Sequence, residues 1–104
     1  MIKSFENYLV YEKRYSPHTI ISYKNDIRQF SEFIEKVYNI YDIIEVDHYM
    51  IRSWLVKLMQ EKKNAKSINR KFSALRSFYL FLKRFFSINY IFNYLFVRFT
   101  GGFY

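Results

Sequence analysis

Residues 66–84, KSINRKFSALRSFYLFLKR, combine a helical apolar periodicity with a strong excess of positive charge. Apolar side chains recur here in steps of three and four residues, the spacing of one face of an α-helix, at Ile68, Phe72, Leu75, Tyr79, Leu82 and then Phe86. The stretch also contains six Lys or Arg and no Asp or Glu. We therefore predict a helix, starting at Lys66 or Ser67, whose aromatic stripe faces a core and whose cations form an outward face.

The predicted outward face of this helix follows from a rotation of about 100° per residue. The positions opposite the apolar stripe are Lys66, Arg70, Ser73, Ser77 and Arg84. We expect Lys71, Arg76 and Lys83 to flank the stripe, with their stems on apolar surface and their charged ends in water. An ordinary solvated helix mixes both signs of charge, whereas this chain has no acidic residue from Lys62 onward. An anionic partner is the simplest reason for such a face.

Three more helices are predicted upstream, and the clearest begins at SPHT. Ser16 is a good N-cap and Pro17 occupies the first helical position, so we expect a helix from there to about Tyr38. A second helix is expected from about Ile2 to Arg14, and a third from about His48 to Lys62 after a cap at Asp47. The expected core positions of these helices are Phe5, Tyr8, Leu9, Ile20, Tyr23, Ile27, Phe30, Ile34, Val37, Ile51, Trp54, Leu55, Leu58 and Met59.

The composition limits the fold and the chemistry. At 104 residues, with 51% hydrophobic residues, two Gly and one Pro, the chain predicts one all-α domain rather than a β-sandwich or a disordered tail. It has no Cys, no Gly-rich phosphate loop and only two histidines, His18 and His48, which are far apart. We therefore expect no cofactor, no metal and no catalytic centre in these residues. Without a signal peptide or a long apolar run, we expect a cytoplasmic protein.

Charge is distributed unevenly along the chain. Residues 1–61 contain eight Lys or Arg and nine Asp or Glu, a net charge of −1, whereas residues 62–104 contain nine Lys or Arg and no acid, a net charge of +9. Such asymmetry indicates either nucleic acid or an acidic membrane surface as the partner. The mixture of cations, hydroxyls and amides at the helix starts favours a phosphate backbone.

Two stretches resemble one known family. YSPHTIISYKNDIRQFSEFI (15–34) is similar to the first conserved block of the N-terminal core-binding domain of tyrosine recombinases, the phage-integrase and Xer-type family. Residues 66–84 resemble the second block, whose Ser-hydrophobic-x-Arg-(Arg/Lys)-hydrophobic-Ser-Ala-(Leu/Ile)-Arg-x-Phe run begins here at Ser67. The resemblance covers roughly residues 3–86.

The resemblance implies a four-helix, SAM-like orthogonal bundle over residues 1–86. In this family the bundle forms half of a C-shaped clamp around double-stranded DNA, and a separate C-terminal domain carries the chemistry of DNA integration and recombination. The domain itself is then non-catalytic, and Asp26 and Arg76 are structural. The implied DNA-binding residues are Thr19, Lys24, Arg28, Lys66, Ser67, Asn69, Arg70 and Ser73.

Residues 87–104 depart from the family pattern, because they are rich in aromatic residues and lack the expected Asn-Pro. They could form an extra apolar helix, contact another protomer through residues 88–104, or be the altered end of a gene. Two alternatives to DNA binding stay open at this point. One is a helical protein-interaction module that self-associates through this tail, and the other is attachment to a membrane surface through the basic helix and the tail.

Overall fold

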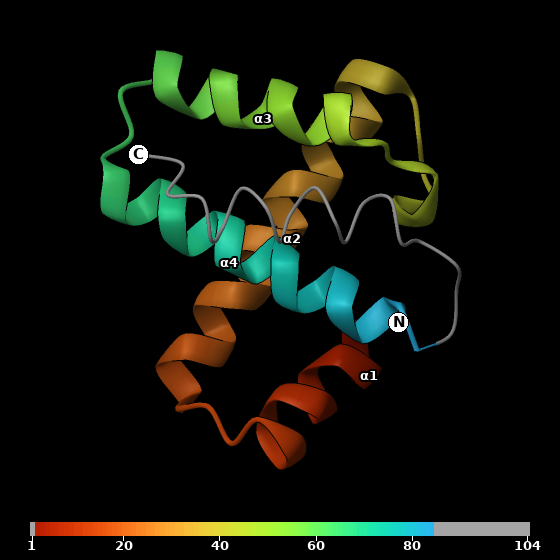
Figure 1. Ribbon diagram of the computed structural model, residues 1–104, viewed down its shortest axis with the longest axis vertical. Coiled ribbons are helices and arrows are strands. Elements are labelled where there is room, and N and C mark those ends of the chain that lie inside the picture. The colour runs from red at the N-terminus through yellow and green to blue at the C-terminus, as the bar shows by residue number, and fades with distance from the viewer. Residues whose placement is uncertain (1, 85–104) are drawn as a thin grey trace.

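The computed structural model of the chain describes residues 2–84, and all its regular segments are helical (Figure 1). Helix α1 (Ile2–Asn7) continues into a π-helical segment, η1 (Tyr8–Glu12). Three longer helices follow, α2 (Pro17–Tyr38), α3 (His48–Gln60) and α4 (Ala65–Leu82), with a 3₁₀ turn, η2 (Ile43–Glu45), before α3. No strand occurs in this part of the chain, and the predicted all-α class is confirmed.

Polar side chains start the three long helices by binding backbone N–H groups that the first turn leaves without a partner. Ser16 accepts a hydrogen bond from the N–H of Thr19 at 3.3 Å, and Asp47 accepts one from the N–H of Met50 at 3.0 Å. Both caps were predicted. Asn64 caps α4 in the same way, through the N–H of Ser67 at 2.8 Å, so α4 begins at Ala65, slightly earlier than expected.

Left-handed backbone conformations lie between helices. Asn39 has φ 58° and directly follows α2, a position at which Asn is well tolerated. Arg14 (φ 54°) and Lys62 (φ 61°) lie in the turns that precede α2 and α4. The first and third helices consequently end at Glu12 and Gln60, two residues before the predicted ends.

Helix α4 lies at the centre of the bundle (Figure 1). Helix α2 crosses behind it at a steep angle, α3 runs along one side of it, and α1 lies near the first half of α2. This arrangement matches the expected orthogonal, SAM-like bundle. Among the described residues, no helix is both long and apolar enough to cross a bilayer.

Aromatic side chains from all four helices fill the core. Phe78 of α4 meets Phe5 of α1 with ring centroids 5.0 Å apart, and Phe30 of α2 meets Trp54 of α3 at 5.1 Å. The hydroxyl of Tyr79 donates to the carbonyl of Ile43 at 2.8 Å, which satisfies its polar end and anchors the connector before α3. The predicted stripe of α4 is buried from Ile68 to Leu82, whereas Phe86 lies outside the described residues.

The predicted core was wrong at two positions and incomplete at others. Val37 is 54% exposed and Met59 is 41% exposed. Val37 lies on the buried stripe of α2 but in its last turn, where it borders a groove beside α3 instead of being covered. Phe33, Phe78 and Phe81 are buried although they lie off the simple stripes, because α2 and α4 are each contacted by more than one helix.

Truncation of Phe30 should separate a true core position from an apparent one. Phe30 is fully buried against Trp54, so Phe30→Ala should lower the free energy of unfolding by about 3–5 kcal/mol. Val37→Ala, on the same stripe of α2, should change it by less than about 0.5 kcal/mol. Urea unfolding followed by circular dichroism measures both variants. Equal losses would show that the last turn of α2 is packed more tightly than described.

Candidate nucleic-acid interface

The first turns of α4 expose one polar face, which we call the α4 face and define as Lys66, Asn69, Arg70 and Ser73. The first three of these residues are exposed and Ser73 is half-buried. Their spacing of three and four residues places them on one side of the helix. Asn64 caps the first turn through the N–H of Ser67, and the positive end of the helix dipole lies at this end of α4, near Lys66. Ser67 lies beside the face and is half-buried.

Beneath the α4 face, a buried carboxylate joins α4 to α2. The side chain of Asp26 is 1% exposed and accepts hydrogen bonds from Arg70 Nε at 3.0 Å and Arg70 Nη2 at 2.9 Å. Lys71 Nζ donates to the same carboxylate at 2.9 Å and also to Gln29 of α2. A single acid thus holds two cations that are neighbours in sequence and point to different depths.

The two cations differ in their exposure to solvent. The side chain of Arg70 is 44% exposed, whereas that of Lys71 is 6% exposed. The hydrogen bonds to Asp26 raise the pKa of Arg70, with burial opposing them. Arg70 therefore stays charged at the surface. The structural role expected for Asp26 agrees with this geometry.

Two expectations about α4 were wrong. Lys71 does not keep its charged end in water, because Asp26 and Gln29 bind it in the interior. Ser77 is 9% exposed and lies within the bundle rather than on the outward face. The charge of the stretch is also partly neutralised, by acids that lie far upstream: Asp26 pairs with Arg70 and Lys71, and Glu12 pairs with Arg84. The sequence neighbours of α4 gave no sign of these partners.

The predicted residues on α2 divide into separate groups. Thr19 takes part in the N-terminal cap of α2, where its hydroxyl is hydrogen-bonded to that of Ser16 at 3.0 Å. Lys24 donates to Glu6 of α1 at 2.7 Å, which lowers the pKa of that carboxyl. Lys24 and Arg28 each lie two positions from Asp26, a rotation of about 200° around the helix. Since Asp26 faces α4, both residues project from the opposite side of α2.

Other polar residues of α2 lie on the side of Asp26. Ser22 precedes Asp26 by four positions and Gln29 follows it by three, so both flank it along the helix. Ser22 is half-buried and Gln29 is exposed. Gln29 was not among the predicted site residues, although its spacing from Asp26 was a usable signal. Among residues 2–84, no cluster of three or more His, Cys, Asp or Glu is arranged to hold a metal ion.

A second ion pair lies at the far end of α4. Arg84 Nη1 and Nη2 donate side by side to Glu12 Oε2 and Oε1, at 2.9 and 2.8 Å. The guanidinium also lies over the ring of Tyr8, 4.7 Å from its centroid. The hydrogen bonds lower the pKa of Glu12 and raise that of Arg84. This pair fastens the end of α4 to η1 and belongs to the architecture rather than to the α4 face.

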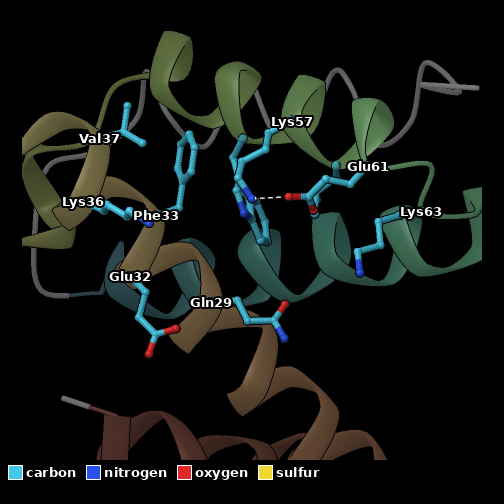
Figure 2. Close-up of a pocket in the computed structure, with 10 residues that line it drawn as sticks. Gln29, Glu32, Phe33, Lys36, Val37, Lys57, Glu61 and Lys63 are labelled. Atoms are coloured by element: carbon cyan, nitrogen blue, oxygen red, sulfur yellow. Dashed lines mark hydrogen bonds and ion pairs between the residues drawn. The ribbon is translucent and has the colours of Figure 1, made fainter.

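A groove of about 410 Å³ lies between α2 and α3, and Figure 2 shows residues that line it. Its apolar wall includes Phe33, Trp54 and Leu58, and its rim carries both signs of charge, including the ion pair of Lys57 with Glu61. Because its rim contains both acids and bases, neither sign of charge dominates the groove. We therefore take the α4 face as the candidate site.

Comparisons with known proteins point in one direction. The family model described as the N-terminal SAM-like domain of phage integrases matches residues 2–85. Tyrosine recombinase XerC of Rickettsia africae is 40% identical over 88 residues, which cover 81% of this chain and 29% of the relative. Tyrosine recombinase XerC of Anoxybacillus flavithermus is 46% identical over 80 residues, which cover 77% of this chain and 26% of the relative. The chain thus spans less than a third of the length of these curated relatives. No solved structure matches it.

Removal of the Asp26 carboxylate should be costly. In Asp26→Ala, Lys71 keeps a buried charge without its acid, so we expect the free energy of unfolding to fall by about 3–5 kcal/mol. Glu61→Gln provides the control, because it removes an exposed ion pair within a single helix and should leave stability nearly unchanged. Thermal or urea unfolding measures both. A small effect of Asp26→Ala would mean that Lys71 reaches water in the folded protein.

Proposed function

The chain belongs to the phage-integrase N-terminal SAM-like domain family, as a domain of the Xer type of tyrosine recombinase, and from this premise we propose that it binds duplex DNA through the α4 face. Family membership makes it a domain involved in recombination. The relatives are named as tyrosine recombinases, and this chain covers less than a third of the length of each. DNA contact and its location on α4 are our proposals.

The composition of the α4 face is the observation that carries the proposal. Lys66 and Arg70 supply positive charge, and Asn69 and Ser73 supply neutral donors beside them. No acid within residues 2–84 forms an ion pair with Lys66, and the only acid bonded to Arg70 is the buried Asp26. Phosphate backbones are bound by this combination of cations, small polar groups and a helix start. A face with these donors attracts the phosphates of DNA, and it contains no exposed carboxylate that would repel them.

The predicted residues outside the α4 face stand differently. Ser67, beside the face, can contribute a hydroxyl to the same backbone. Thr19, Lys24 and Arg28 remain predicted DNA contacts, but Lys24 and Arg28 project from the other side of α2. For Lys24 and Arg28 to contact DNA, a second stretch of the DNA backbone has to pass along that side of α2. A clamp that encloses the duplex would supply one.

We further propose that the chemistry of strand cutting and joining belongs to another domain of the whole protein. The α4 face contains donors but no nucleophile paired with a base, and its role is to hold DNA in register. The domain then forms one half of the clamp, with the catalytic domain as its partner and with no role at a membrane. A cytoplasmic location is part of the same proposal.

DNA binding by the 104-residue chain should be measurable and sensitive to salt. We expect Lys66→Ala to weaken binding to a duplex of about 30 base pairs, or roughly three helical turns. The salt slope, which is the slope of the logarithm of the binding constant against the logarithm of the salt concentration, should become smaller in magnitude by about one unit. Fluorescence anisotropy of the labelled duplex over a series of salt concentrations measures both quantities. The parent's own affinity should be modest, because half a clamp makes few phosphate contacts.

Arg52→Ala is the matched control for Lys66→Ala. Arg52 is exposed on α3, lines the groove beside Val37 and lies away from the α4 face. The two variants lose the same net charge, so a general Coulomb attraction would affect them equally. A larger loss in Lys66→Ala supports the α4 face, and equal losses would reject it. Absence of any binding by the parent at low salt would reject DNA binding by this domain alone.

Self-association through residues 88–104 is a separate proposal that rests on sequence. Thirteen of the twenty residues from 85 to 104 are apolar, which is more than a monomer readily leaves in water. We expect the whole chain to show a mass that rises with concentration by light scattering after size exclusion, and a chain ending at residue 87 to stay monomeric. A monomer in both cases, with unchanged stability, would contradict this proposal.

A further inference from the structure

The guanidinium of Arg70 is held by one edge only. Its Nε–H and one N–H of Nη2 donate to the two oxygens of Asp26. A guanidinium carries five N–H donors, so the two N–H groups of Nη1 and the second of Nη2 remain. One N–H of Nη1 and the remaining N–H of Nη2 point in parallel along the edge that joins the two nitrogens, which is a different edge from the one that binds the carboxylate. The side chain is 44% exposed, which is compatible with access of a ligand to this edge.

The carboxylate that holds Arg70 is itself fixed. Asp26 is 1% exposed, and Lys71 binds its Oδ1 at 2.9 Å from inside the bundle. Lys71 is held in turn by Gln29. Asp26 therefore cannot swing to follow the guanidinium, and Arg70 takes its orientation from the crossing of α2 and α4. A flexible surface arginine has been turned into a donor pair with a set direction.

The cluster also keeps a charge that suits an anion. One carboxylate faces two cations, so Asp26, Arg70 and Lys71 together carry a net charge of about +1. The positive remainder lies toward Arg70, because Lys71 is buried beneath it. An acceptor that approaches from solvent meets an attractive field in spite of the acid below. The ion pair therefore does not cancel Arg70 as a ligand for DNA.

We propose that Asp26 is a positioning residue that aims the free Nη1–Nη2 edge of Arg70 at two adjacent acceptors on duplex DNA. Two parallel N–H groups match either two oxygens of one phosphate or O6 and N7 of one guanine. The shared chemistry is a planar pair of acceptors, which the rigid fork of a guanidinium fits better than the flexible point charge of an ammonium does. This inference rests on the proposed function and assigns separate roles to Arg70 as the contact and Asp26 as its guide.

The test starts with Arg70→Lys, which keeps the charge and removes the paired donors. We expect at least a fivefold loss of affinity for duplex DNA, about 1 kcal/mol, with the salt slope unchanged. Arg52→Lys on α3 is the matched control and should bind as the parent does. If Arg70→Lys also binds as the parent does, Arg70 acts as a point charge and the inference is overturned. If the parent itself does not bind, the proposed function fails first.

Asp26→Asn tests the positioning role of Asp26, because two explanations predict opposite changes in the affinity for DNA. Removal of a negative charge should strengthen DNA binding if Coulomb attraction alone matters. Loss of the fixed edge should weaken it, to about the level of Arg70→Lys, and the double variant should be no weaker than either single one. Circular dichroism of each variant checks the fold, and if Asp26→Asn is unfolded, Arg70→Lys and its control decide the matter. Folded Asp26→Asn that binds as well as the parent or better would overturn the inference.

A duplex in which 7-deazaguanine replaces guanine distinguishes the two acceptors. This base lacks N7, so a guanine contact predicts that the substituted duplex costs the parent more affinity than it costs Arg70→Lys. A phosphate contact predicts that Arg70→Lys is weaker than the parent by the same factor on both duplexes. Either pattern supports the aimed edge and identifies what it binds. A parent and an Arg70→Lys variant that match on both duplexes would refute it.

Discussion

The carboxylate of Asp26, buried between Arg70 and Lys71, is the interaction on which the rest of the bundle depends. It ties the middle of α2 to the first turns of α4. The two helices cross each other in the bundle (Figure 1). Burial of an ion costs several kcal/mol, and only close partners of opposite charge offset that cost. Unlike apolar packing, which tolerates small slips, this contact is satisfied in one relative placement of the helices. It therefore helps to set the register of α4 against α2, while the apolar core accounts for the burial of α4.

The two sides of α4 have different roles, and the contact with Asp26 lies between them. Aromatic residues from Phe72 to Phe81 supply apolar burial toward the core, and the opposite side of the first turns carries Lys66, Asn69 and Arg70. Arg70 belongs to both sides, since one edge of its guanidinium serves the fold and the other faces solvent. Such a surface is rigid, because its cation Arg70 is fixed by two hydrogen bonds to Asp26 of α2. Stiff donors lose less entropy when they bind than free side chains do.

The sequence was sufficient wherever the signal was local. The caps at Ser16 and Asp47, the helical period of α4 and the family blocks each occupy a few neighbouring residues, and they predicted the class and the order of helices. The first family block marked Asp26 as structural, but its partner Arg70 lies 44 positions away, and no local pattern pairs the two. Lys71 was assigned to water for the same reason, since its burial depends on where α2 crosses. Val37 was misplaced because periodicity gives a direction around the helix but not the length over which a neighbour covers it.

The pairing of Glu12 with Arg84 has a mechanical meaning. It joins positions 72 residues apart, so the residues just after α4 are fastened to η1, near the start of the domain. Both side chains are about half exposed, so the two hydrogen bonds give a modest and salt-sensitive hold against fraying at the end of α4. While the pair is intact, a load applied at Arg84 is shared between α4 and η1.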